Sequence, residues 1–143
     1  MAIYTFRYTP WQTDPCPAFP SGLKTKRPIL NVTVINGVSR IPCFAMVDSG
    51  ADYVAFPTSV MASLGIDSSV ALPGNMVGIG AQPDSFFHNA EIEVEDFLRI
   101  NLNVGFTEAL DSWGIGILGR VGFFDRVKNV NFNFESDVFT IEN

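Results

Sequence analysis

"FAMVDSGADYVAFP" (residues 44–57) sets one carboxylate, that of Asp48, at the end of an apolar run and follows it with a serine and a glycine. A second carboxylate, that of Asp52, precedes another apolar run. Burying an unpaired carboxylate is costly, so Asp48 needs either a structural partner or a chemical purpose. The patterns in the rest of the chain decide between these two explanations.

The composition is that of one acidic globular domain. The chain has 143 residues, of which 47% are hydrophobic and 13 are phenylalanine, enough for a substantial core. The net charge is −6, and the basic residues are scattered except for "KTKR" at residues 24–27, which we expect to be a solvated loop. Nucleic acid is therefore not expected as a partner. We predict a single domain over residues 1–143, in which residues 1–27 form an N-terminal strand and a proline-rich extension.

Neither a cofactor nor a membrane anchor is indicated. Cys16 and Cys43 lack metal-ligand spacing, and a disulfide between them is allowed but not implied, so two buried or idle thiols are favoured. The chain has no phosphate loop and no dinucleotide fingerprint, which argues against another kind of small-molecule enzyme. Its start lacks the features of a signal peptide, and no apolar stretch approaches the length of about 18 residues that spans a membrane. We expect a soluble, cytoplasmic protein without a metal or cofactor.

Alternating apolar residues predict mostly strands. A first strand is expected at residues 3–8, followed by an irregular loop because prolines crowd residues 10–20. Alternation from Leu30, a turn at Asn36 and Gly37, and a return to Asp48 predict a hairpin whose second strand is buried on both faces. The remaining expected elements are a helix over 57–66, a long hairpin over 74–96, a strand over 98–106, a strand and a short helix within 112–128, and a hairpin over 129–142 around Ser136 and Asp137.

Three separated stretches together carry a family resemblance: "VDSGAD" (47–52), "VGIGA" (77–81) and "GILGR" (116–120). This arrangement resembles the retropepsin-like aspartic proteases, the single-domain relatives of the retroviral protease. The resemblance covers roughly residues 28–142. It implies an all-β, mainly antiparallel fold: a closed acid-protease-like β-barrel with a flap hairpin and two short helices.

The resemblance also implies roles for individual residues. Asp48, Ser49 and Gly50 correspond to the catalytic triplet, and Arg120 is expected to form an ion pair with Asp52, with bidentate geometry. In that family a glycine-rich flap closes over the substrate. The residues that would bind substrate are therefore Ala51, Asp52, Val77, Gly78, Ile79, Gly80 and Ala81. The flap departs from the family pattern, with Ala81 where a further glycine is common and Pro83 at its tip.

An aspartic protease activates water between two carboxylates that share one proton. The chain contains Asp-Ser-Gly only at Asp48, because Asp67, Asp84 and Asp111 precede serines that no glycine follows. The second carboxylate would have to come from a second copy, on a two-fold axis. The prediction is therefore a homodimeric aspartic endopeptidase that hydrolyses peptide bonds, with itself and a peptide or protein substrate as partners. The alternative is a non-catalytic dimerisation or peptide-binding module on the same fold.

Several of these residues, and some others, also have simpler structural explanations. Taken alone, Asp48 could be a turn residue, Gly78 and Gly80 a bulged hairpin, and Arg120 an exposed arginine at a helix start. His88 lies in an alternating strand without a nucleophile elbow and is expected to be structural. The acidic row of Glu91, Glu93 and Glu95 is expected to be a solvated strand face rather than a metal site. Trp11 and Trp113 are expected in the core or at an interface.

Overall fold

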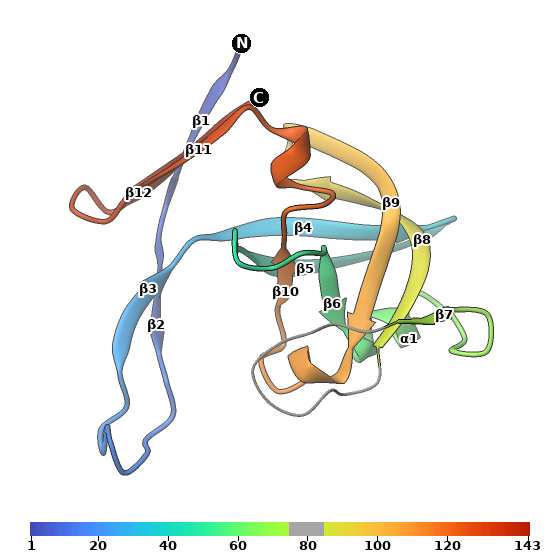
Figure 1. Cartoon of the computed structure of the whole chain (residues 1–143), viewed down its shortest axis with the longest axis horizontal. Helices are drawn as coiled ribbons and strands as arrows, with labels where there is room; N and C mark the ends of the chain where they lie inside the picture. The colour runs from blue at the N-terminus through green and yellow to red at the C-terminus, as the bar shows by residue number, and fades with distance from the viewer. Residues whose placement is uncertain (75–84) are drawn as a thin grey trace. The chain divides into compact units, whose positions relative to one another are not determined.

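The structure, a computed structural model, describes residues 1–74 and 85–143 (Figure 1). These residues form two compact units. One unit is Leu30–Arg126, and the other combines Met1–Ile29 with Val127–Asn143. The Asp48 stretch lies in the first of these units.

The unit Leu30–Arg126 is a closed β-barrel. Its strands are β4 (Ile29–Asn36), β5 (Ser39–Val47), β6 (Ala55–Pro57), β7 (Leu72–Gly74), β8 (Ser85–Val94), β9 (Leu98–Thr107) and β10 (Gly116–Leu118). They form one sheet in the order β4-β5-β10-β6-β9-β8-β7, which closes where β4 also pairs with β8. Most pairings are antiparallel, but β10 runs parallel to β5 and β6 runs parallel to β9. The predicted mainly antiparallel barrel is confirmed.

The first predicted hairpin of the barrel is present as β4 and β5, whereas of the second, predicted over residues 74–96, the structure describes only Gly74 and residues 85–96. Gly37 has a φ of +61° in the turn between β4 and β5, a conformation that suits glycine. Strands β7 and β8 pair from Leu72 with Phe87 to Gly74 with Ser85. The proposed flap residues, Val77–Ala81, lie outside the described residues. Figure 1 shows β8 continuing into β9 as two long strands that curve side by side.

The prediction that β5 is buried on both faces is wrong. Phe44 is 56% exposed, whereas Ala45 and Val47 at the end of the strand are buried. The reason is the length of β10, which pairs with only the last three residues of β5. Among the strands of residues 1–74 and 85–143, the first part of β5 therefore has only β4 as its neighbour in the sheet.

Short helical segments lie between the strands: α1 (Thr58–Ser63), η1 (Glu108–Leu110) and η2 (Phe124–Arg126). Helix α1 matches its prediction, with Val60 and Met61 buried and Gly65 at a φ of +72° just beyond its end. Its first residue is capped from a distance, because Asp111 accepts hydrogen bonds from the N–H (2.7 Å) and the hydroxyl (2.6 Å) of Thr58. The helix predicted after Arg120 is only one 3₁₀ turn, and it begins after the buried Phe123.

Large side chains without exposed surface fill the barrel. They include Val34, Phe56, Ile92, Phe106, Leu118 and Phe123. Along β8 the alternation is as predicted, because Ala90, Ile92 and Val94 are buried and the glutamates between them face outward into ion pairs. The strand that leads to Asp48 therefore ends against a packed core.

The second unit contains a three-stranded sheet in the order β1 (Ile3–Arg7), β12 (Val138–Glu142), β11 (Asn129–Asn133). The strand and the hairpin predicted for these segments are confirmed, with Asp137 at a φ of +61° in the turn. Phe139 and Ile141 on the central strand have no exposed surface. The two termini are adjacent, since the N–H of Asn143 donates to the carbonyl of Ala2 (3.0 Å).

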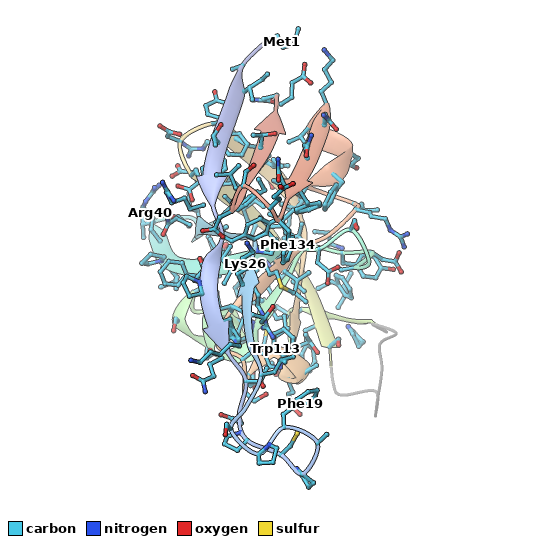
Figure 2. The ribbon with its side chains drawn as sticks, turned by 90° about the vertical axis from the view of Figure 1, so that its left-hand side faces the viewer. Met1, Phe19, Lys26, Arg40, Trp113 and Phe134 are labelled. Atoms are coloured by element: carbon cyan, nitrogen blue, oxygen red, sulfur yellow. The ribbon has the colours of Figure 1, made fainter. Side chains whose placement is uncertain are left out.

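The segment predicted to be an irregular proline-rich loop is instead a hairpin of β2 (Thr9–Gln12) and β3 (Lys24–Arg27). A two-stranded sheet has a free edge on each side, so Pro10, which lacks an N–H, can lie opposite Lys26. Figure 2 shows Phe19 in the loop at the far end of this hairpin, and Lys26 near Phe134. The Lys26 ammonium donates to the carbonyl of Phe134 (2.6 Å) and pairs with Asp137 (3.0 Å), which joins the hairpin to the three-stranded sheet.

Candidate active site

Asp48 lies on a tight turn directly after β5. Its N–H donates to the carbonyl of Leu118 on β10 (3.1 Å), which extends the parallel pairing by one residue. Its carboxylate Oδ1 accepts the N–H of Gly50 (2.9 Å), and its carbonyl accepts the N–H of Ala51 (3.2 Å). The Asp48 side chain is half-buried, whereas Ser49 and Gly50 are exposed. The turn therefore holds one carboxylate oxygen in place and leaves Oδ2 without a hydrogen-bond donor from the described residues.

The segment after β10 runs along this turn. The N–H of Arg120 donates to Ala51 (2.8 Å) and that of Val121 donates to Asp52 (2.9 Å), and Tyr53 and Val121 form a parallel β-bridge. Gly119 is the point of closest approach, because a Cβ there would overlap the carbonyl oxygens of Ala51 and Tyr53. Only glycine fits at this crossing. The absence of a side chain there lets the "GILGR" stretch approach the "VDSGAD" stretch closely enough for the backbone hydrogen bonds that join them.

Asp52 and Arg120 are brought together as an ion pair, as the sequence predicted. The contact joins Nη2 of Arg120 to Oδ1 of Asp52, so it uses one nitrogen and one oxygen instead of the predicted bidentate geometry. Both side chains are more than half exposed, at 58% and 61%. The second oxygen of Asp52 remains open to solvent or to a ligand.

One aromatic contact beside this turn was not predicted. The rings of Tyr53 and Phe87 on β8 pack edge to face, with a centroid separation of 5.2 Å and an interplanar angle of 74°. Phe87 also lies over Gly74 on β7, where an added Cβ would overlap its ring. The sequence does place an aromatic residue, Tyr53, immediately after Asp52. The separation of Tyr53 and Phe87 along the chain, however, does not identify Phe87 as its partner. The contact links the turn to the paired strands β7 and β8.

The other residues considered in the sequence lie in structural roles. His88 Nδ1 contacts the carbonyl of its neighbour Asn89 (2.7 Å). Glu93 pairs with Arg40 (2.8 Å) and Arg99 (3.1 Å), and Glu91 also pairs with Arg99, so these two glutamates form a salt-bridged strand face. Glu95 lies just beyond β8, and its carboxylate accepts the N–H of Asn31 (2.7 Å). Trp113 is exposed and so does not belong to the core.

Both cysteines are free thiols, and burial raises the pKa of Cys43 to about 12. Over residues 1–74 and 85–143 no three His, Cys, Asp or Glu side chains are grouped so as to hold a metal ion. The helices in the same ranges are all too short or too polar to cross a membrane.

Comparisons with solved structures identify the fold. A retropepsin-like aspartic protease from Rickettsia conorii superposes with a TM-score of 0.61 at 14% identity, over 98% of this chain and 91% of that chain. The EIAV protease, solved in complex with the inhibitor HBY-793, superposes with a TM-score of 0.53 at 22% identity, over 66% of this chain and 83% of that chain. The barrel is thus a retropepsin-like fold.

Sequence comparison identifies the family. No curated protein matches the chain. The family model described as "Aspartyl protease" matches residues 30–121, a range that contains the Asp48 turn, Gly119 and Arg120 and most of the barrel. That range is more than half of the chain, so this protein belongs to the aspartyl protease family.

Proposed function

We propose that this protein is an aspartic endopeptidase that acts as a homodimer, in which Asp48 of each copy supplies one carboxylate of the dyad. The observation that carries the proposal is the difference between the bonding partners of the two carboxylates on the turn. Asp48 is held by the Gly50 N–H through Oδ1 alone, whereas Asp52 is engaged by Arg120. One chain therefore supplies one carboxylate suited to the chemistry, and a dyad requires a second copy.

The chemistry follows from two carboxylates that share one proton. The ionised member takes a proton from the water that attacks the peptide carbonyl, while the protonated member donates its proton to the carbonyl oxygen. The tetrahedral intermediate then collapses, the C–N bond breaks, and a proton passes to the leaving nitrogen. The two protonation steps belong to the pair and not to either Asp48 alone.

The neighbouring residues have proposed roles that fit their positions. The exposed hydroxyl of Ser49 would bond across the dimer, and Gly50 leaves room for a substrate backbone. Ala51 already uses its N–H and its carbonyl within the chain, so it would contribute its small side chain only. Asp52 would receive a substrate amide on its open oxygen, and Val77–Ala81 would cover the substrate. We also propose that residues 1–143 work as one protease domain, which the 98% coverage by the Rickettsia conorii structure supports.

Subunit mixing tests the shared dyad. The wild-type chain is expected to cleave an unfolded protein substrate, and a pepstatin-type inhibitor should block that cleavage. When half of the wild-type chain is replaced by Asp48→Asn chain at constant total concentration, random pairing after equilibration leaves about a quarter of the dimers with two Asp48 carboxylates. Activity should therefore fall to about a quarter and not to a half.

The outcomes separate the alternatives. A fall to one half would mean that each chain carries a complete site, which contradicts the shared dyad. A stable dimer that cleaves nothing under any pH tested would instead support the non-catalytic dimerisation or peptide-binding module. Sedimentation of the same samples supplies the oligomeric state for both outcomes.

A further inference from the structure

We propose that a polar pocket on the wall of the barrel, beside Asn89 on β8, binds a short extended peptide segment that carries no charge. The pocket has a volume of about 330 Å³, within the range of about 300–1,000 Å³ that small-ligand sites have. It is lined by the turn that precedes β5, whereas Asp48 follows the other end of that strand. Binding there is separate from the proposed cleavage at Asp48 and does not depend on it.

One edge of β8 is interrupted at this pocket. β4 pairs with that edge as far as Ile35 opposite Glu91, and β7 pairs with it from Leu72 opposite Phe87. In Figure 1 the end of β4 and the strand β7 lie at different heights along β8. Neither strand pairs with residues 88–90, so the shared edge has a gap with Asn89 at its centre.

The backbone of Asn89 faces this gap. The N–H of Glu95 donates to the carbonyl of Asn31 on β4 (2.8 Å), so the hydrogen-bonded pairs of β4 and β8 are those of the odd-numbered residues. β8 pairs with β9 along its whole length without a bulge, so the alternation continues through Asn89. The carbonyl of Asn89 is contacted by His88 Nδ1 (2.7 Å). Its N–H is therefore left facing the pocket, where neither β4 nor β7 can accept it.

The other uncharged polar groups of the pocket are carboxamides. Asn36 at the end of β4, Asn89 on β8 and Asn101 on β9 line it, and their side-chain amides have no hydrogen-bond partner within residues 1–74 and 85–143. Each carboxamide offers both a donor and an acceptor. A peptide main chain also carries both kinds of group, so it can satisfy the carboxamides and accept the Asn89 N–H. The pocket thus has the properties of a sheet edge to which an extended peptide adds.

The charged side chains around the pocket offset one another. Arg99 pairs with Glu91 and with Glu93 (3.1 Å), and Arg40 pairs with Glu93 (2.8 Å). Two guanidinium groups are therefore matched by two carboxylates, and the buried Ile35 supplies an apolar part of the lining. A charged ligand would lose hydration here without gaining an unpaired counter-charge, so a neutral segment is favoured.

Amide NMR tests the site directly. The probe is the neutral peptide acetyl-Ser-Thr-Ser-amide, added to the full-length Asp48→Asn chain so that it is not cleaved. We expect the backbone amide of Asn89 and the side-chain amides of Asn36 and Asn101 to shift together with one dissociation constant. The same peptide with its central nitrogen methylated lacks one donor, so it should bind about fivefold more weakly, the effect of one hydrogen bond.

Two asparagines on the same face of β9 provide matched variants. Asn101 lines the pocket, whereas Asn103, two residues further along the strand, does not. Both are exposed, so alanine at either position should leave the thermal unfolding midpoint within about 4 °C of that of the parent chain. Asn101→Ala should raise the dissociation constant of the peptide about fivefold, and Asn103→Ala should change it by less than about twofold.

Each result supports or overturns the site. Saturable shifts at Asn89 that weaken with Asn101→Ala but not with Asn103→Ala would support it. Shifts confined to the Asp48 turn, such as that of the Gly50 amide, would place the peptide elsewhere and overturn it, as would equal weakening by the two variants. Unchanged affinity of the methylated peptide would overturn main-chain pairing. Shifts at Asn89 with maltose but not with the peptide would assign the pocket to a polyhydroxyl ligand and overturn the peptide.

Discussion

Arg120 and Asp52 form an ion pair between residues 68 positions apart in the chain, with Nη2 of Arg120 on Oδ1 of Asp52. The same two segments are joined by backbone hydrogen bonds from Arg120 to Ala51 and from Val121 to Asp52. The side-chain pair is exposed, whereas Gly119 at the crossing is buried. The backbone crossing should therefore hold the Asp48 turn, and the ion pair should add little to stability.

The first prediction concerns that ion pair. Arg120→Gln, Asp52→Asn and the double substitution should give a coupling free energy of about 0.2–1 kcal/mol, because exposed pairs are solvated and screened by salt. Urea unfolding at low and high ionic strength measures it. Arg126→Gln is the control, since the ion pair of Arg126 within the described residues is with its neighbour Asp125, at 3.6 Å. A coupling above about 2 kcal/mol would contradict the assignment as a surface pair.

The second prediction concerns Gly119. Gly119→Ala should lower the free energy of unfolding by about 3 kcal/mol or more, because its Cβ would overlap two carbonyl oxygens. Gly114→Ala is the matched control. Gly114 has a φ of +68° but open space around it, so the cost should be only the left-handed strain of about 1–2 kcal/mol. Equal losses for the two variants, measured by denaturant unfolding, would show that the crossing tolerates a side chain.

The third prediction separates chemistry from folding at Asp48. Asp48→Asn should reduce kcat/KM by about 10³-fold or more, because an amide can neither accept the proton of water nor share a proton with a second carboxylate. The fold should remain, since the amide oxygen can still accept the Gly50 N–H. Thermal unfolding should thus shift by no more than about 4 °C.

Asp67→Asn is the control for this substitution. Asp67 also precedes a serine and accepts a backbone N–H, that of Ser69 (2.8 Å), but it lies in a loop outside the Asp48 turn. The proteolytic activity of the Asp67→Asn variant should equal that of the wild type. Proteolysis by Asp48→Asn at the wild-type rate would rule out Asp48 as the reacting carboxylate.

The fourth prediction is a loss of stability at alkaline pH that depends on Cys43. Burial raises the pKa of this thiol to about 12, whereas a thiol in an unfolded chain has a pKa of about 8.5. Above the lower value the unfolded chain holds fewer protons than the folded chain, so stability falls as the pH rises toward 12. The slope reaches at most about 1.4 kcal/mol per pH unit.

Urea unfolding between pH 8 and pH 10.5 measures this slope. Cys43→Ala should remove the Cys43 contribution, while Cys16→Ala should leave it unchanged because Cys16 is exposed. The three chains differ only at the two cysteines, so the difference between variants isolates the thiol. Parallel curves for the wild type and Cys43→Ala would contradict the prediction.

Much of the barrel could be predicted because its signals are local. Alternation identified β4 and β8, and glycines at Gly37 and Gly65 marked a turn and a helix end that need a positive φ. The unusual "VDSGAD" stretch, with its two partner stretches, indicated the family that the sequence comparison then established. The pairing of Asp52 with Arg120 came from that resemblance and not from spacing.

The errors have a common physical cause. Pro10 and the "KTKR" run were predicted to lie in loops because their local propensity disfavours a strand. Both nevertheless lie in a two-stranded hairpin, whose free edges tolerate such residues. Strand β5 was predicted to be buried on both faces because it is an apolar run. That run does not reveal that β10 pairs with only three residues of β5. In both cases the neighbour of the strand decided the outcome, and local periodicity does not contain that information.

By itself, the sequence determined which segments alternate, where the turns fall, and that a single Asp-Ser-Gly ends an apolar strand. Only the tertiary structure decided that Gly119 must cross the Asp48 turn, that Asp111 caps α1, and that Tyr53 meets Phe87. These contacts join residues far apart in the chain, and they depend on which strands become neighbours when the barrel closes. Periodicity and propensity act over a few residues, so they specify the elements but not the partners that each element meets.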